Sequence, residues 1–246
     1  MFYLHLFLGL IFGSFLNVLV LRLPKNVSII KPGSQCFYCK HPIKWYYNIP
    51  LISFFYLNRT TICCSKKIPI QYPIVELSSM LLWIWSYFYL SDLSVRILFL
   101  IISSILLVII LTDFYYFIIP LELNIFMILS ILCFKFFKSS NIINETLMVI
   151  IFCAIFILII SLISRVLNKD VMGFGDIILI GVISIWLNFF DLLIIIFLST
   201  ILSLLHWLLL YAKSKKSNIK LPFGSSLSLI TIIYYIFTIT FDIKIY

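Results

Sequence analysis

The stretch VRILFLIISSILLVIILTD, residues 95–113, decides the fold class. Between Arg96 and Asp113 it contains no charged residue, and only three side chains carry a hydroxyl group. A helix needs about 20 mostly apolar residues to cross a bilayer. We therefore expect Val95–Leu111 to span a membrane, with Asp113 at the end of the span.

The rest of the chain has the same character. It has 246 residues, of which 63% are hydrophobic and 11% are charged, whereas soluble domains are roughly 45–50% apolar and about 25% charged. This composition excludes an ordinary soluble domain, and it also excludes a disordered chain. It predicts an all-α polytopic membrane protein with about eight transmembrane helices. The predicted spans are Phe2–Leu21, Pro73–Leu90, Val95–Leu111, Phe117–Phe137, Leu147–Ser164, Ile177–Phe189, Leu192–Leu210 and Pro222–Phe241.

The basic residues predict the orientation. The chain has 18 Lys and Arg against 9 Asp and Glu, and 14 of the 18 fall on one side of the predicted membrane. Because basic residues gather in cytoplasmic loops, we expect that side to be cytoplasmic and both termini to lie opposite. The excess positive charge then needs no nucleic-acid partner. The predicted organisation is a first transmembrane helix (1–23), a cytoplasmic cysteine loop (24–72) and a seven-helix core (73–246).

The loop at 24–72 holds four of the six cysteines, Cys36, Cys39, Cys63 and Cys64. In the reducing cytoplasm disulfides are disfavoured, and paired thiolates on short turns are typical of structural zinc sites. The second pair is irregular, because Thr61 stands where a CxxC ending at Cys64 would begin. His41 offers another ligand. Two interpretations stay open: a structural zinc knuckle, or a loop that has lost its metal.

Acidic side chains at membrane depth usually have a function, and four acids lie there: Glu76, Asp113, Glu122 and Asp176. Asp113 and Asp176 both fall at the cytoplasmic ends of spans. The two crossings between them return the chain to the same face, so they can lie at the same depth. Residues 173–176, Gly-Phe-Gly-Asp, put two glycines before an aspartate at a helix start. The alternative role for Asp176 is a helix N-cap.

Two aspartates held close together have a defined chemistry. They cannot both ionise easily and so share a proton. One then activates a water molecule as general base, and the other protonates the carbonyl oxygen and the leaving amine. An aspartyl protease is therefore one function that this pair would support.

These residues resemble the prepilin peptidases, or type IV leader peptidases, which are membrane aspartyl proteases of the GxGD type. The resemblance rests on seven motifs in order along the chain: Gly13-Ser-Phe-Leu-Asn-Val18, Arg22-Leu-Pro24, Cys36-x-x-Cys39 with Asn48-Ile-Pro50, Tyr72-Pro-x-x-Glu76, Asp113 with Ile119-Pro120, Gly173-x-Gly175-Asp176, and Pro222-Phe-Gly224.

The resemblance implies an enzyme of the bacterial inner membrane that removes the basic leader from type IV prepilins and pseudopilins. Asp113 and Asp176 would be catalytic, and Gly173 and Gly175 would form the active-site loop. Proteolysis would need no cofactor. Many members also N-methylate the new terminus with S-adenosylmethionine; Glu76 would serve that step, or else be a carboxylate at the membrane interface.

The chain departs from the family pattern at three positions: Thr61 replaces a cysteine, Ile178 replaces a frequent Lys, and Leu121 replaces a frequent acid. The first departure lies in the cysteine loop, and the metal site and methyl transfer would depend on this loop more than proteolysis does. Two other functions are kept as alternatives, a cation-coupled transporter and a catalytically inactive scaffold for pilus assembly.

Overall fold

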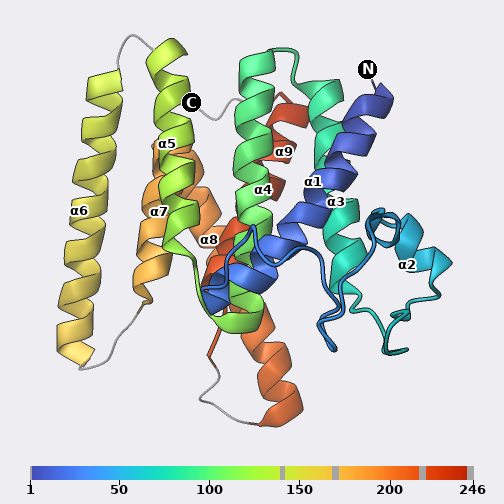
Figure 1. Cartoon of the computed structure of the whole chain (residues 1–246). Helices are drawn as coiled ribbons and strands as arrows, with labels where there is room; N and C mark the ends of the chain where they lie inside the picture. Colours follow the sequence, from blue (N-terminus) through green and yellow to red (C-terminus); the bar gives the residue numbers. More distant parts are fainter. Residues whose placement is uncertain (1, 139–141, 168–171, 216–219, 243–246) are drawn as a thin grey trace. The chain divides into compact units, whose positions relative to one another are not determined.

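The structure is a computed structural model, and it describes residues 2–138, 142–167, 172–215 and 220–242. These residues contain helices and no strand (Figure 1). The helices are α1 (Phe2–Arg22), η1 (Leu23–Lys25), η2 (Trp45–Asn48), α2 (Ile52–Tyr56), α3 (Gln71–Tyr89), α4 (Leu93–Tyr116), α5 (Leu121–Lys138), α6 (Ile142–Leu167), α7 (Phe174–Trp186), α8 (Phe189–Ser214) and α9 (Phe223–Thr240). The chain divides into two compact units, Met1–Val108 and Ile109–Tyr246.

The N-terminal unit is built on the close pairing of α1 and α3. A Cβ atom added to Gly9 would lie 2.7 Å from the Cα atom of Met80, and one added to Gly13 would lie 2.6 Å from the Cα atom of Glu76. Only glycine leaves room for so close an approach of two helix backbones. The two glycines therefore set the distance between α1 and α3.

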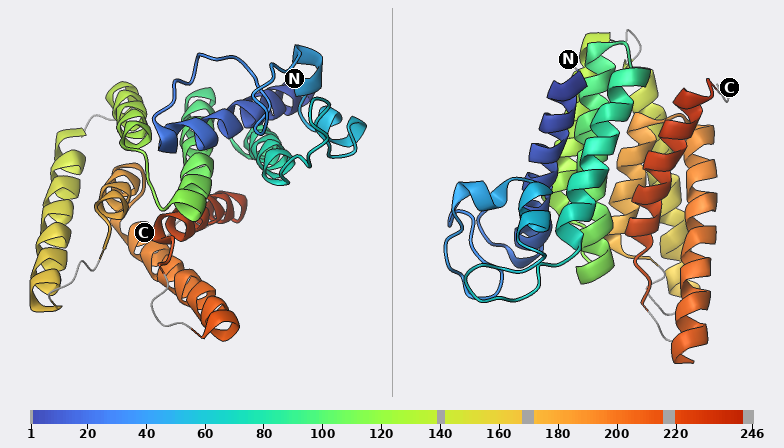
Figure 2. Two further views of the ribbon diagram at one scale, coloured as in Figure 1. Left: turned by 60° about the horizontal axis from the view of Figure 1, so that its bottom comes forward. Right: turned by 90° about the vertical axis from the view of Figure 1, so that its right-hand side faces the viewer.

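The long connection between α1 and α3 is anchored to the helix pair at its beginning and again near its middle. Its beginning is held by the guanidinium group of Arg22, which donates hydrogen bonds to the carbonyl oxygens of Ser28, Ile29, Pro32 and Gly33 at 2.7–3.1 Å. Further along, the N–H of Leu51 donates to Oε2 of Glu76 on α3 at 2.8 Å. Both views of Figure 2 show this loop beside the lower parts of α1 and α3. It is a folded element that is fixed to its own helices.

The C-terminal unit is organised around α7, which contacts α5, α6, α8 and α9. Its central residues Leu179, Ile180 and Ile183 are fully buried. A helix that is apolar on every side packs at the centre of a bundle. The start of α7, where Asp176 lies, is thereby held among the neighbouring helices.

Each of the eight predicted spans falls mainly on a different helix, which confirms the all-helical fold class. Within the described residues, four helical segments are long and apolar enough to cross a membrane: Phe2–Lys25, Leu93–Tyr116, Phe189–Lys213 and Phe223–Thr240. The predicted start of the fourth span at Phe117 is wrong, because α5 begins at Leu121. Phe117 has a φ of 54°, and Ile119 precedes a proline, which disfavours helical backbone. Glu122 lies in the first turn of α5.

Candidate functional site

Asp113 and Asp176 meet at the start of α9. Asp113 is in the last turn of α4 and only 6% exposed, and Asp176 is half-buried in the first turn of α7. A Cβ atom built on Gly224 would lie 3.1 Å from Oδ1 of Asp176 and 3.2 Å from Oδ2 of Asp113. Since both oxygens lie so close to a single point, they can be separated by no more than twice that distance. The structure thus brings the two predicted catalytic residues together.

Backbone amides of α9 face both carboxylates. The N–H of Ser225 donates to Oδ2 of Asp113 at 2.6 Å, and the N–H of Gly224 is directed toward the carboxylate of Asp176. The first N–H groups of a helix lack partners within the helix and carry a partial positive charge. The N-terminus of α9 therefore stabilises the negative charge that the aspartate pair shares.

The alternative interpretation of Asp176 as a helix N-cap is wrong, because the N-cap of α7 is Gly173. Asp176 is instead the third helical residue, and its carboxylate lies back against the backbone of Gly173. Its Oδ1 atom has no hydrogen-bond partner within the described ranges. Since buried polar atoms normally have one, this oxygen is an unused hydrogen-bond acceptor at the site.

The side chain of Ile119 packs against the starts of α7 and α9, each of which contains a glycine. A Cβ atom on Gly224 would lie 2.5 Å from Cδ1 of Ile119, and one on Gly175 would lie 3.1 Å from Cβ of the same side chain. The glycines at 175 and 224 thus make room for the segment between α4 and α5. Gly175 was predicted to be an active-site residue, whereas the positioning roles of Ile119, Gly224 and Ser225 were missed. Their signal was present in the motifs Ile119-Pro120 and Pro222-Phe-Gly224.

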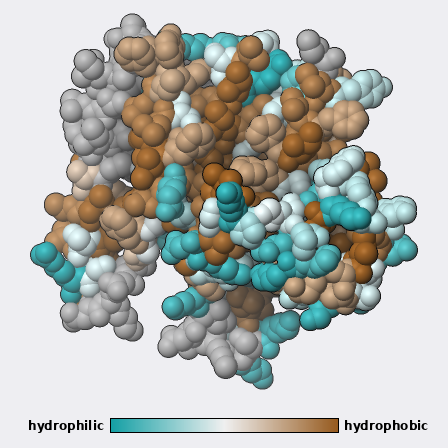
Figure 3. Space-filling model, viewed as in Figure 1, coloured by the Kyte–Doolittle hydropathy of each residue, from teal (hydrophilic) through white to brown (hydrophobic). Residues whose placement is uncertain are grey.

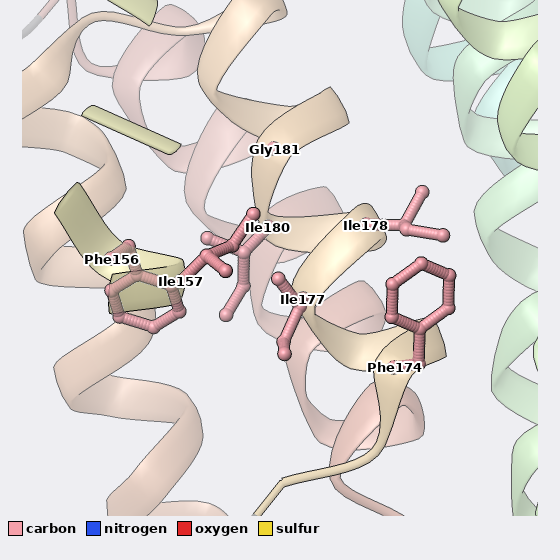
Figure 4. A pocket seen from close by; sticks show the side chains of 7 residues that line it. All are labelled: Phe156, Ile157, Phe174, Ile177, Ile178, Ile180 and Gly181. Carbon is pink, nitrogen blue, oxygen red and sulfur yellow. The ribbon is translucent and has the colours of Figure 1, made fainter. Parts of the chain in front are cut away.

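A separate pocket of about 160 Å³ lies between α6 and α7. Figure 4 shows its lining, which is made by Phe156, Ile157, Phe174, Ile177, Ile178, Ile180 and Gly181. All seven lining residues are apolar. The pocket offers no acid, base or nucleophile, so we place no chemistry there.

Glu76 belongs to the N-terminal unit and is 6% exposed. In addition to the hydrogen bond from the N–H of Leu51, its carboxylate interacts with the side chain of Ser14 on α1. Asn17, one helical turn further along α1, donates to the carbonyl oxygen of Tyr72 at 3.2 Å. The motifs around Ser14, Asn17 and Glu76 therefore form one polar contact between α1, α3 and the loop.

The four loop cysteines form a cluster. The Sγ atoms of Cys36, Cys39, Cys63 and Cys64 all lie within 4.8 Å of one another, with 3.8 Å between Cys36 and Cys64. Four sulfurs around a tetrahedral zinc ion, each at about 2.3 Å, would be ~3.8 Å apart. The cluster therefore fits a metal of this kind, and His41 is not part of it.

Two turns with the same backbone pattern hold these cysteines. In the first, the N–H of Cys36 donates to the carbonyl oxygen of His41 at 2.8 Å; in the second, the N–H of Thr61 donates to that of Lys66 at 2.8 Å. Both turns end in a left-handed residue, Lys40 with φ 61° and Ser65 with φ 53°. Thr61 thus takes the place of Cys36 in the second turn, and Cys63 supplies the fourth sulfur instead.

The packing of the thiols drives the pKa values of two of them apart. For Cys36, burial raises the pKa, but hydrogen bonds from the backbone N–H groups of Cys39 and Tyr38 and from neighbouring thiols outweigh it and lower the pKa to about 6. The pKa of Cys63 rises to about 12, mainly because of its hydrogen-bonded contacts with the thiols of Cys39 and Cys36. Thiols this close cannot all ionise alone, whereas a bound metal ion would deprotonate them together.

The comparisons with known proteins cover both units. Residues 7–90 match the bacterial peptidase A24 N-terminal domain, and residues 100–208 match the type IV leader peptidase family. The second match contains both Asp113 and Asp176. No solved structure matches the chain.

Curated relatives carry the name prepilin leader peptidase/N-methyltransferase. The relative from Vibrio cholerae is 31% identical over 220 residues, which cover 83% of this chain and 85% of the relative. The relative from Myxococcus xanthus is 46% identical over 76 residues, and that from Klebsiella pneumoniae is 39% identical over 82 residues. The chain spans 23% and 36% of the length of these last two relatives.

Proposed function

The chain belongs to the type IV leader peptidase family, and we propose that Asp113 and Asp176 are the catalytic pair of a membrane aspartyl endopeptidase. Its substrates are type IV prepilins and pseudopilins, from which it removes the basic leader. The observation that carries the proposal is the convergence of both carboxylates on Gly224, where a Cβ atom would touch an oxygen of each.

The geometry supports a water-activating mechanism. The attacking water would bind between Oδ1 of Asp176, which lacks a protein partner, and the carboxylate of Asp113. The pair shares one proton. The ionised member takes a proton from the water as it attacks the scissile carbonyl carbon, and the protonated member gives its proton to the carbonyl oxygen. When the intermediate collapses, a proton passes to the leaving amine.

The N-terminus of α9 holds the charge of this pair in place. The N–H of Ser225 keeps one oxygen of Asp113 as an acceptor, so the carboxylate stays oriented whichever member carries the shared proton. Gly173 is exposed and has no side chain, which leaves space for the extended backbone of a substrate beside Asp176. The space beside Gly175 is filled by Ile119.

The location follows from the charge distribution. We propose that the protein lies in the bacterial inner membrane with eight spans, and that the cysteine loop and both aspartates face the cytoplasm. Both termini lie on the opposite side. This arrangement puts the catalytic pair at the depth of the bond that joins a cytoplasmic leader to a hydrophobic pilin helix.

Two further properties are proposed for the N-terminal unit, a structural zinc site and methyl transfer. Cys36, Cys39, Cys63 and Cys64 would hold a structural zinc ion, which stabilises a loop too small for its own core. Glu76 would serve methyl transfer from S-adenosylmethionine to the new N-terminus of the pilin. That carboxylate also fixes the loop through Leu51, so the two roles need to be separated experimentally.

The test is cleavage of a co-expressed prepilin by Asp113→Asn and Asp176→Asn variants. Each should abolish processing, because the amide cannot exchange a proton with water or substrate. Glu122→Gln is the matched control, since it removes an exposed carboxylate in the first turn of α5 and should leave processing unchanged. Normal processing by either aspartate variant would refute the proposal and favour a transporter or an inactive scaffold.

A further inference from the structure

Residues 45–56 form an aromatic segment on the surface of the N-terminal unit. The segment comprises η2 and α2, which pack on each other: the hydroxyl of Ser53, itself buried, donates to the carbonyl oxygen of Tyr46 at 3.4 Å. Its large side chains point outward instead. The exposed fractions are 79% for Trp45, 63% for Ile52, 70% for Phe55 and 77% for Tyr56. Such a cluster of exposed apolar side chains usually marks an interaction surface.

The depth of this segment is fixed by a hydrogen bond. The N–H of Leu51, the residue before α2, donates to Oε2 of Glu76 at 2.8 Å. Glu76 lies five residues after the start of α3 at Gln71, which is about 7.5 Å along the helix axis. The aromatic segment therefore lies beside the first turns of α3 rather than beyond its end, and Figure 1 shows α2 beside the lower part of α3.

With α3 spanning the bilayer, as proposed above, its surroundings at this depth are the boundary between lipid headgroups and acyl chains. Over the N-terminal unit, Figure 3 shows hydrophobic residues along the upper parts of the helices and hydrophilic residues gathered over the loop. Tyr and Trp are enriched at such boundaries, because one part of the ring system is apolar and another can form hydrogen bonds. Trp45 and Tyr56 match this preference.

The charge of the loop identifies the partner. Residues 24–72 contain seven Lys and Arg and no Asp or Glu. Two of these bases flank the aromatic segment: Nζ of Lys44 lies 5.9 Å from the ring of Tyr46, and the guanidinium of Arg59 lies 5.7 Å from the ring of Phe54. A basic rim around apolar side chains suits anionic lipid headgroups.

We propose that the aromatic segment inserts into the anionic leaflet on the loop side of the membrane. The side chains of Trp45, Ile52, Phe55 and Tyr56 reach the acyl chains, and Lys44 and Arg59 bind the headgroups. Through its hydrogen bond with Leu51, Glu76 thereby links the inserted segment to α3. This anchoring goes beyond peptide cleavage and does not depend on it, because it involves no substrate.

The test measures the depth of Trp45 in vesicles. The full chain is reconstituted in phosphatidylethanolamine and phosphatidylglycerol with bromine on the acyl chains, either near the headgroup or near the chain end. The difference in emission between the wild type and Trp45→Phe isolates this residue from the other four tryptophans. Bromine near the headgroup should quench it at least about twofold more than deep bromine, since interfacial segments lie about 5–10 Å deep. No quenching by either would overturn the proposal.

Charge-matched variants separate insertion from mere proximity. Phe55→Asp with Tyr56→Asp should abolish the quenching of Trp45, whereas Asn26→Asp with Ser28→Asp adds the same charge at exposed polar positions of the loop, away in sequence from Lys44 and Arg59, and should preserve it. If both double variants lose the quenching of Trp45 equally, the assignment of membrane insertion to the rings of Phe55 and Tyr56 is overturned. In vesicles of phosphatidylcholine alone the quenching should fall, and unchanged quenching there would refute the role of Lys44 and Arg59 in binding anionic headgroups.

Discussion

Replacing Gly224 by alanine adds one methyl group at the point on which the two carboxylates converge. The backbone does not oppose the change, since none of the described glycines has a positive φ. The new Cβ atom would lie 2.5 Å from Cδ1 of Ile119, 3.1 Å from Oδ1 of Asp176 and 3.2 Å from Oδ2 of Asp113. The isoleucine methyl is the end of a flexible side chain and can rotate away. The carboxylates must separate, and the proposed water loses its place.

The expected effects on folding and on catalysis differ in size. A shifted rotamer of Ile119 costs about 0.5–1.5 kcal/mol, and alanine in place of glycine near a helix start offsets up to about 0.8–1.0 kcal/mol. The free energy of unfolding should therefore fall by no more than about 1.5 kcal/mol. Misplacing catalytic groups by about 1 Å costs on the order of 100-fold in rate, which corresponds to about 2.7 kcal/mol in the activation barrier. Activity should fall without loss of fold.

The assay is the initial rate of prepilin cleavage by purified protein, combined with thermal unfolding of the same sample. Gly33→Ala is the control, because a Cβ atom there would have no neighbour within 4 Å. The double variant Gly224→Ala/Ile119→Val removes the methyl group that clashes and should stay inactive. Cleavage by Gly224→Ala within about threefold of the wild type, or recovery in the double variant, would refute the reasoning.

Three further outcomes are expected. Gly13→Ala should lower the unfolding temperature, because its Cβ atom would lie 2.6 Å from the backbone of α3 and overpacking costs about 1–3 kcal/mol; Gly33→Ala should not, and equal melting curves would contradict the close packing. Glu76→Gln keeps an acceptor for the loop and should allow cleavage while abolishing methylation, as read by mass spectrometry of the processed pilin; a methylated product would exclude this carboxylate from methyl transfer. Cys36→Ser should remove zinc from the purified protein, whereas Cys133→Ser on α5 should retain it, and equal metal content in both would rule out the cluster as the zinc site.

The helices could be predicted well because membrane spans follow from local composition. Val95–Leu111 lies within α4, and each other predicted span overlaps one helix. The errors lie at helix ends, where apolar sequence continues but the backbone does not. Phe117 is as apolar as its neighbours, yet its left-handed φ and the proline three residues later end the helix there. Hydropathy reports the cost of exposure to water and carries no information on such a backbone break.

The aspartate pair could be predicted in part for a different reason. Counting crossings places Asp113 and Asp176 at one face, and few acids compete with them. The count cannot reveal that α9 comes between them, because the contact of Gly224 with both carboxylates depends on how three helix ends pack. Ile119 is a plain apolar residue in sequence, and only the packing of two glycines against it shows that it positions the site.

The cysteine loop shows how a departure from a spacing rule can leave a site intact. Adjacent cysteines looked unsuited to a single ion, and Thr61 removed the expected ligand. In the structure the second turn keeps the backbone hydrogen bonds of the first, although threonine replaces cysteine, so the turn does not depend on the missing sulfur. Within that turn Cys63 reaches Cys39 at 3.2 Å, and the hydroxyl of Thr61 lies 3.1 Å from the sulfur of Cys64. The lost ligand is thus replaced two residues along the same turn, and the threonine retains a hydrogen bond to the cluster. A spacing rule tests where ligands stand in sequence, whereas the ion requires only that four sulfurs meet.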